Sequence, residues 1–431
     1  MSDTHSESIS FVRESFLPEV PPPAAEAGPV KWLRANLFSG AVNSVMTLLA
    51  LALLIYILWG FLPWLLGGNW TASNIRECRE IFQGSGAGCF AVLTERWNQL
   101  LFGFSYPPSE YWRPTLSLLL LAVVIAPVLF SHLPRWLLIV TALYPFTAYW
   151  LIWGGTIFTP VMALAGVIAG YFAYRRAVER GFAVGLLAGL VVALFVWWLG
   201  GLAAASEPDS LALERVPSRD MGGFMLNMIL GVVCVSLSLP IGILLALGRQ
   251  SSLPIVKWIC VVFIEFIRGV PLITLLFVAN VVLAYFLPPG TNFDLILRVI
   301  IMITMFASAY IAEVIRGGLA ALPRGQYEAA DSLGLDYAQA MRLIILPQAL
   351  KISIPGIVNV AVGLFKDTTL VSIISMFDLV GMIRGPILAS TDWNGVYWEL
   401  FGFAALLFFV VCYGISQYSQ WLERKLATDH R

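Results

Sequence analysis

Apolar stretches long enough to cross a membrane recur along this chain, and they constrain its fold more than any other feature. Of its 431 residues, 59% are hydrophobic and only 12% are charged. A soluble domain of ordinary composition carries roughly twice that charged fraction. The sequence therefore predicts an all-α polytopic membrane protein, embedded in the lipid bilayer.

About ten of these stretches approach the length of 17 to 25 residues that a membrane-crossing helix needs. They cover approximately Ala41–Leu66, Pro114–Phe130, Trp136–Trp153, Ile157–Tyr174, Phe182–Gly200, Gly223–Leu247, Ile255–Leu287, Leu295–Ile315, Ile352–Ile374 and Val396–Tyr418. The stretch Ile255–Leu287 is too long for one simple crossing. We expect its beginning, as far as Arg268, to lie partly at the membrane interface.

Basic residues indicate which ends of these stretches face the cytoplasm. Lys31 and Arg34 precede the first stretch, and Arg424 and Lys425 follow the last. By the positive-inside rule, both termini are predicted to be cytoplasmic.

The loop 67–113 then falls on the outer, periplasmic side, and it contains Cys78 and Cys89. In an oxidising compartment the two thiols can pair and close a loop of about a dozen residues. Two free thiols are the alternative.

Composition divides the chain into two modules with tails. We predict a disordered cytoplasmic tail at 1–38 and an N-terminal transmembrane extension at 39–201. A polar linker at 202–221 leads to a second module at 222–426, and a short C-terminal tail at 427–431 ends the chain. The formal net charge is zero, which gives no case for a nucleic-acid partner. The sequence contains no metal-ligand spacing.

One polar stretch, 322–350, interrupts the second module and reads LPRGQYEAADSLGLDYAQAMRLIILPQAL. Pro323 suits the first turn of a helix, and Gly334 stands where a left-handed C-terminal cap would end it. Asp336 and Gln339 have the spacing of a capping box that opens a second helix. We predict that this second helix ends before Pro347, which begins the next one.

The same stretch resembles the EAA loop of ABC importer permeases. That pattern is E-A-A, three residues, G, nine residues, then I-x-L-P, and it is met here by Glu328, Ala329, Ala330, Gly334, Ile344, Leu346 and Pro347.

Three more stretches resemble the polar amino-acid branch of that family: Glu265–Leu272 (EFIRGVPL), Glu313–Gly318 (EVIRGG) and Lys366–Leu370 (KDTTL). The family usually has T-S in the last of these, and Thr369 keeps the hydroxyl. The resemblance covers about residues 220–425. The long N-terminal extension is similar to the glutamate/glutamine/aspartate/asparagine or general L-amino-acid permeases of Gram-negative bacteria.

The resemblance implies a type I ABC importer permease core of about five transmembrane helices in the bacterial inner membrane. Such a subunit moves polar L-amino acids into the cytoplasm, here acidic amino acids and their amides or a broad range. It is powered by a separate ATPase dimer that binds ATP and Mg, fed by a periplasmic binding protein, and paired with a second homologous permease. This chain contains no G-x-x-x-x-G-K-[ST] sequence, so we expect it to bind no cofactor and to be no enzyme.

In the family, the EAA loop contains a coupling helix that docks in a groove of the ATPase. Ala329 and Ala330 are small enough for close approach, and Glu328 offers a charge to a basic partner. Ile344, Leu346 and Pro347 can anchor the second helix against the membrane face. A plain helical hairpin between two spans is the alternative.

Charged residues of the other motifs are costly inside a bilayer, at roughly 2.5 to 3.5 kcal/mol each. We expect Arg268 and Arg316 near the cytoplasmic interface, held by snorkelling or by Glu265 and Glu313 three residues before them. Lys366 and Asp367 are adjacent and point to different faces of their helix. Two roles are open for these two residues and for Thr368, Glu265, Arg268, Glu313 and Arg316. They line the substrate pathway, or they fasten their helices to a neighbour.

Two other functions compete with this interpretation. An ion- or proton-coupled secondary transporter often has two repeated halves with broken helices, and no convincing repeat is visible. An integral-membrane enzyme would need clustered carboxylates, histidines or a nucleophile with its base, and these are absent from the sequence.

Overall fold

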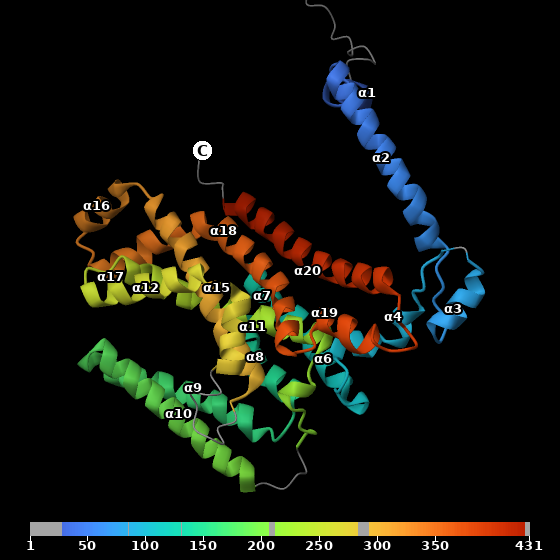
Figure 1. The fold of residues 1–431 in the computed structure, drawn as a ribbon. Helices are drawn as coiled ribbons and strands as arrows, with labels where there is room; N and C mark the ends of the chain where they lie inside the picture. Colours follow the sequence, from blue (N-terminus) through green and yellow to red (C-terminus); the bar gives the residue numbers. More distant parts are fainter. Residues whose placement is uncertain (1–27, 85, 131, 207–211, 283–292, 427–431) are drawn as a thin grey trace, which may run out of the picture. The chain divides into compact units, whose positions relative to one another are not determined.

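A computed structural model describes residues 28–84, 86–130, 132–206, 212–282 and 293–426 (Figure 1). Within these ranges, every regular element is a helix. The chain divides into two compact units. One consists of Met1–Gly68 with Ser85–Gly88, and the other of Asn69–Gly84 with Cys89–Arg431.

The first unit contains helix α1 (Gly28–Asn36) and the long apolar helix α2 (Ala41–Leu66). Helix α2 has the predicted bounds of the first span, and its side chains are not buried. The prediction of disorder was wrong for 28–36, while residues 1–27 lie outside the described ranges. Trp32 and Leu33 stand there between Lys31 and Arg34, and this combination of apolar and basic residues favours a short amphipathic helix beside a membrane.

Residues 69–84 and 89–106 of the second unit form a small helical subdomain, which a disulfide bond between Cys78 and Cys89 cross-links. It contains α3 (Ile75–Phe82), α4 (Ala91–Glu95) and α5 (Trp97–Phe102). The backbone N–H of Cys89 donates to Glu399 Oε1 over 2.9 Å, at the beginning of α20 (Tyr397–Leu426). The N–H of Ile75 donates to the carbonyl of Asp392 over 2.8 Å. These bonds attach the subdomain to the segment that leads into α20.

We expect replacement of Cys78 by Ser to destabilise this subdomain by about 2 to 3 kcal/mol, because the reduced chain regains loop-closure entropy on unfolding. Thermal denaturation of the purified protein, with and without reductant, measures the effect. Wild type should respond to the reductant and the variant should not. Cys412→Ser, which changes a free half-buried cysteine, is the matched control. A wild-type midpoint that ignores complete reduction would contradict the prediction.

The remaining extension helices are α6 (Trp112–Val124), α7 (Ala126–Leu129), α8 (Leu137–Trp153), α9 (Phe158–Ala177) and α10 (Phe182–Ser206). Helices α9 and α10 form a close antiparallel hairpin (Figure 1). A Cβ atom added to Gly170 would lie 2.6 Å from the carbonyl oxygen of Gly189, so the two backbones touch where both residues lack side chains.

Residues 212–221 of the predicted linker pack against the end of α8. The N–H of Val216 donates to the carbonyl of Trp153 over 2.9 Å. The fully buried side chain of Arg113 donates to the carbonyls of Leu151 and Glu214 over 2.7 and 2.8 Å. The extension from Asn69 onward and the core therefore lie in one compact unit, and the predicted boundary at 202–221 does not coincide with a division between units.

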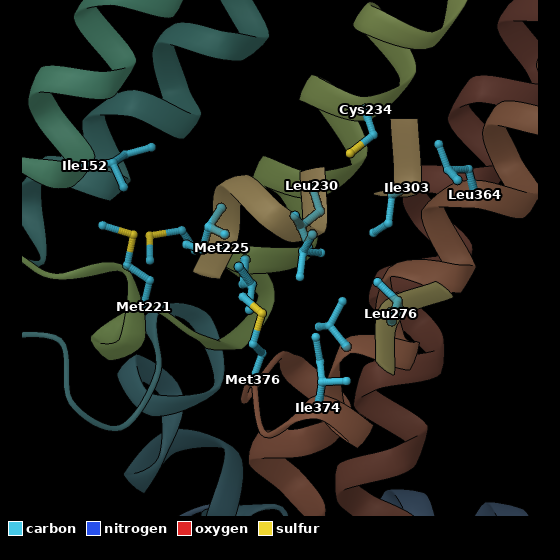
Figure 2. Packing of buried hydrophobic residues seen from close by; sticks show 14 of the residues in the cluster. Ile152, Met221, Met225, Leu230, Cys234, Leu276, Ile303, Leu364, Ile374 and Met376 are labelled. Atoms are coloured by element: carbon cyan, nitrogen blue, oxygen red, sulfur yellow. The ribbon is translucent and has the colours of Figure 1, made fainter. Parts of the chain in front are cut away.

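The core begins with α11 (Gly223–Arg249), α12 (Pro254–Gly269), α13 (Leu272–Phe277) and a π-helical turn (Val278–Val282). It continues with α15 (Leu295–Ala320), α16 (Arg324–Ser332), α17 (Tyr337–Ala340), α18 (Leu346–Asp367), α19 (Leu379–Met382) and α20. Leu230 of α11, Ile303 of α15, Leu364 of α18 and Leu276 of α13 meet in one apolar cluster (Figure 2). This packing holds the helices that carry the charged motifs.

Eight helices in the described ranges are long and apolar enough to cross a membrane, or nine if a bent pair counts as one span. The bent pair is Pro254–Gly269 with Leu272–Val282, at 103°. The bend divides the stretch Ile255–Leu287, which was too long for one crossing. It lies at Pro271, which has no N–H to continue the helical hydrogen bonds. Helix α8 is apolar but shorter, with 17 residues, and it corresponds to the remaining predicted span.

Candidate coupling loop and charged network

The polar stretch 322–350 forms the two short helices that its sequence predicts. Gly334 follows α16 with φ +70°, and its N–H donates to the carbonyl of Asp331 over 2.9 Å. No atom lies within 4 Å of a Cβ added there, so glycine is favoured by the left-handed backbone alone. The Gln339 N–H donates to Asp336 Oδ1 over 2.8 Å, and the Asp336 N–H donates to Gln339 Oε1 over 3.2 Å. The predicted capping box is confirmed.

The prediction that the second helix ends before Pro347 was wrong. Helix α17 continues through a π-helical turn, Met341–Ile345, into α18. One apolar helix thus runs over Tyr337–Ile374, with 38 residues. Pro347 has no N–H for the usual i→i−4 hydrogen bond of an α-helix. The π-helical turn before it uses a different hydrogen-bond spacing, so the helix can continue past the proline.

The three residues of the E-A-A motif differ in exposure. Glu328 and Ala329 face outward, whereas Ala330 is fully buried and therefore serves the packing of α16 itself. Large apolar side chains also remain exposed on this element, with Leu333 at 73% and Tyr337 at 67% of full exposure. An exposed carboxylate beside apolar residues is typical of a protein interface.

The I-x-L-P residues lie where the π-helical turn meets α18. Ile344 packs against the cluster that contains Ile345 and Ala349. Leu346 and Pro347 line a cavity of about 490 Å³ next to Tyr337 and the end of α11. Gln348 Nε2 donates to Gln326 Oε1 over 2.9 Å, which ties α16 to α18.

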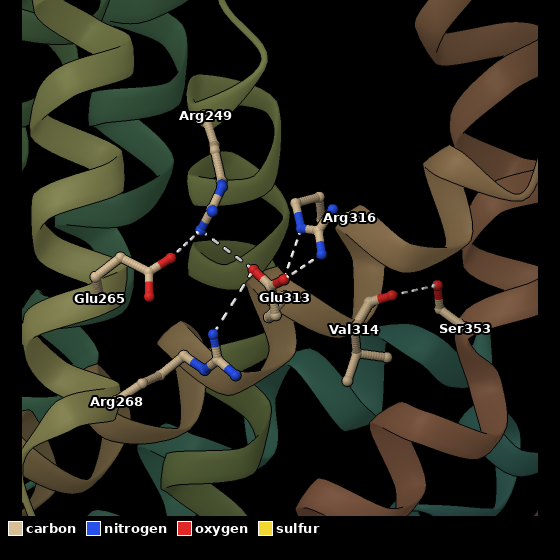
Figure 3. Close-up of polar contacts among 7 residues, drawn as sticks. All are labelled: Arg249, Glu265, Arg268, Glu313, Val314, Arg316 and Ser353. Atoms are coloured by element: carbon tan, nitrogen blue, oxygen red, sulfur yellow. Dashed lines mark hydrogen bonds and ion pairs between the residues drawn. The ribbon is translucent and has the colours of Figure 1, made fainter.

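The charged motif residues of α12 and α15 meet in one network around Glu313 (Figure 3). Glu313 accepts from Arg316 Nε over 2.6 Å and from Arg249 Nη1 over 3.2 Å. Arg268 Nη1 lies 3.9 Å from the same carboxylate. Three arginines from three helices therefore converge on a single half-buried glutamate.

Arg316 pairs with Glu313, which was one of the two alternatives predicted for it. Arg268 contacts Glu313 and not Glu265 among the ion pairs of the described ranges. Glu265 pairs with Arg249 over 2.8 Å, and the Arg268 guanidinium lies 5.5 Å from the ring centre of Tyr310. The helices pack so that contacts between them replace the local contact at i, i+3. Nothing local in the sequence indicates the partners of Arg249, which lie 16 and 64 residues further along the chain.

Lys366 and Asp367 lie at the end of α18, where Lys366 is exposed and Asp367 is half-buried. Neither belongs to any of the ion pairs found in the described ranges. Thr368 is fully buried: its Oγ1 accepts from Asn227 Nδ2 over 2.9 Å and donates to the carbonyl of Phe365 over 2.7 Å. This geometry favours a helix-fastening role for Thr368.

Asn227 and Asp378 complete a buried polar network that sequence reasoning missed. Asn227 Nδ2 also donates to Asp378 Oδ2 over 3.1 Å, and its Oδ1 accepts from the N–H of Leu379 over 3.1 Å. Asp378 Oδ1 accepts from the N–H of Gly381 over 2.9 Å, at the first turn of α19. A lone amide in the otherwise apolar stretch Gly223–Leu247 was the signal that could have indicated it.

Burial raises the pKa of the Asp378 carboxyl from 3.8 to about 6, against the opposing effect of hydrogen bonds from Gly381, Asn227 and Val380. The folded protein therefore favours the protonated acid. Stability from this group is fully present below the ordinary pKa and is lost as the pH rises towards 6.

Between pH 4 and pH 7, we expect the free energy of unfolding of the wild type to fall by about 2 kcal/mol relative to that of Asp378→Asn, because asparagine does not ionise. Thermal midpoints of both proteins across that range measure it. The opposite slope, or two parallel profiles, would contradict the raised pKa.

Comparisons with known proteins agree with these motifs. Residues 238–428 match the family described as "Binding-protein-dependent transport system inner membrane component". The glutamate/glutamine/aspartate/asparagine transport system permease protein BztC of Rhodobacter capsulatus is 53% identical over 441 residues, which cover 100% of both chains. The inner membrane amino-acid ABC transporter permease protein YhdY of Escherichia coli is 39% identical over 407 residues, or 92% of this chain and 93% of its own.

A shorter relative matches about half of this chain. The probable glutamine ABC transporter permease protein GlnP of Bacillus subtilis is 32% identical over 47% of this chain and 90% of its own. Among solved structures, an amino acid ABC transporter with histidines is similar at 32% identity and a TM-score of 0.42, over 47% of this chain and 92% of its own.

The chain belongs to the family of amino-acid ABC transporter permeases, the inner-membrane components of binding-protein-dependent transport systems. It is a multi-pass membrane permease subunit of an importer and not an enzyme, since ATP hydrolysis takes place on a separate ATPase. Nothing in the comparisons supports the secondary-transporter alternative.

Proposed function

We propose that this permease imports glutamate, aspartate and their amides. The observation that carries the proposal is the 53% identity, over the full length of both chains, to a permease named for those four substrates. The periplasmic binding protein that delivers the substrate would largely set specificity. A broad range of polar L-amino acids is the second candidate, favoured by the similarity to YhdY, whose name gives amino acids without further distinction.

Residues 322–350 are proposed to receive the movement of the ATPase dimer that binds ATP and Mg. The exposed Glu328 would pair with a basic residue of that partner, and Leu333 and Tyr337 would fill its groove. The helical run Tyr337–Ile374 supports this role, because it connects the loop to Thr368 without an intervening non-helical segment. Because the ATPase is cytoplasmic, this proposal implies that the loop and both termini face the cytoplasm. The Cys78–Cys89 subdomain would then face the periplasm.

A second, homologous permease would complete the pathway, since one five-helix core provides half of it. Lys366 and Asp367, which have no ion-pair partner in the described ranges, are proposed to face that subunit or the substrate. Glu265, Arg268, Glu313 and Arg316 are proposed to fasten α12 to α15.

Reconstitution of the full complex into vesicles tests the substrate class. With ATP inside, we expect uptake of radiolabelled glutamate and glutamine that unlabelled aspartate and asparagine inhibit, and that leucine and lysine do not. Inhibition by all polar amino acids would replace this specificity with the broad one.

Mass measurement of the purified complex tests the heterodimer. One copy of this chain with one copy of a second permease is expected, whereas two copies of this chain would contradict it.

A further inference from the structure

The extension and the core line two adjoining open cavities, in which neither the coupling loop nor the charged network takes part. The first measures about 700 Å³, beside the beginning of α15, and is lined by Arg215, Arg219 and Arg298. The second measures about 350 Å³ and lies between α6, α8 and α11. Trp153, the last residue of α8, lines both cavities.

The first cavity is positively charged. Its three arginines take part in none of the ion pairs of the described ranges. Arg298 is held in place by the carbonyls of Phe293 and Asn280, at 3.0 and 3.3 Å. Arg215 and Arg219 are exposed.

Asp294 is the one acid among the described residues that line this cavity. It accepts hydrogen bonds from Ser218 Oγ over 2.5 Å and from the N–H of Leu297 over 3.1 Å. The surplus of guanidinium groups therefore suits a phosphate or a carboxylate.

The second cavity is apolar. Its walls include Leu121 of α6, Ala148 of α8 and Met225, Val232 and Val233 of α11. All three helices belong to the apolar stretches of the chain, which makes the cavity wall one that suits a hydrocarbon chain. Its chemistry suits an acyl chain, which gains free energy with every methylene group that leaves water.

Trp153 joins the two environments. Its Nε1 donates to Ser218 Oγ over 2.9 Å on the side of the arginines. Its ring stacks on Tyr149, at 5.4 Å between centroids, and both rings line the apolar cavity. Tryptophan takes this orientation where the hydrocarbon core of a membrane meets the headgroups.

We infer that the paired cavities bind one anionic phospholipid. Its phosphate would lie between Arg215 and Arg219, with Arg298 behind them, and one acyl chain would enter beside Val233. The lipid would fill the seam between the extension and the core, which gives the extension a role in holding the subunit together. A free amino-acid carboxylate would use only the first cavity, since no charged residue lines the second, which is mostly apolar.

Native mass spectrometry of the delipidated full-length chain, titrated with phosphatidylglycerol, tests this inference. We expect one lipid to bind more tightly than the rest. The double variant Arg215→Gln, Arg219→Gln should bind it roughly thirtyfold more weakly, because each arginine near a membrane surface contributes about a fivefold factor. Ser236→Phe changes an exposed residue that lines the apolar cavity and should weaken binding without a change of charge.

The matched control is Arg76→Gln, Arg79→Gln, which removes the same charge from exposed positions of α3 and should bind the lipid as wild type does. Equal loss in the control would overturn the inference. Binding of glycerol phosphate or L-glutamate as tight as that of the lipid would also overturn it, in favour of a free-anion site. Phosphatidylcholine that binds equally well would overturn the anionic specificity.

Discussion

Replacement of Glu328 by Lys is expected to abolish uptake while the protein still inserts into the membrane. Glu328 is exposed on α16, so the substitution removes no packing within this chain. At an interface, a charge reversal exchanges an attraction for a repulsion that costs several kcal/mol. A cost of several kcal/mol corresponds to at least about a hundredfold weaker binding. We therefore expect transport to fall by at least that factor.

Transport of radiolabelled glutamate in cells, together with the amount of permease in isolated membranes, measures the effect. Co-purification of the ATPase with the variant should fall in parallel with transport. The matched control is Glu179→Lys, which reverses an exposed glutamate between α9 and α10 and should leave uptake unchanged. Normal uptake by the Glu328 variant would mean that residues 322–350 are not the coupling element.

Local features of this loop could be predicted from the sequence because each depends on a few consecutive residues. The glycine cap at Gly334 and the capping box of Asp336 and Gln339 both follow from backbone donors and acceptors three to five positions apart. The positions of the apolar helices were predictable for the same reason. The amphipathic helix at 28–36 was missed because polar and proline-bearing neighbours dominated the composition of that segment.

Contacts between helices were not predictable in the same way. Glu265 and Arg268 have the spacing of a local ion pair, yet the packing of α11 against α12 and α15 gives Glu265 to Arg249. Asn227 and Asp378 are separated by 151 residues and meet only because α11 packs beside α19. A single sequence does not show which distant residues are in contact. The order of the motifs therefore predicted the family, whereas the ion pairs and hydrogen bonds between helices are seen only in the structure.

The network around Glu313 suggests why the motifs Glu265–Leu272 and Glu313–Gly318 occur together in the core. Arg249 is the last residue of α11, and Arg268 lies in the last turn of α12. Arg316 follows Glu313 by three residues on α15, which then leads towards α16. One carboxylate thus joins the helix that bends by 103° at its end to the helix that enters the coupling loop. We therefore expect that loss of the Glu313 carboxylate mainly lowers the stability of this chain, because the carboxylate contacts other helices of the same chain.

Glu313→Gln is expected to destabilise the protein by about 3 to 4 kcal/mol, because it leaves the guanidinium groups of three arginines with only Glu265 to balance them. The Glu313 side chain is 20% exposed, which supports a value towards the lower end of the range for buried pairs. Reversible denaturation in mixed detergent micelles gives the free energy of unfolding. Glu265→Gln is the matched control, since that carboxylate is 53% exposed and pairs with Arg249 alone; its loss should be within about 1 kcal/mol.

A double-mutant cycle separates the charge effect from lost packing. Adding Arg316→Gln to Glu313→Gln removes one of the unpaired cations, so the double variant should be more stable than Glu313→Gln alone. If Glu313→Gln were no less stable than Glu265→Gln, the network would be a solvated cluster at the helix ends. If the second substitution destabilised further by the same amount as in wild type, the two side chains would not be coupled, and the close contact between them would contribute nothing to the fold.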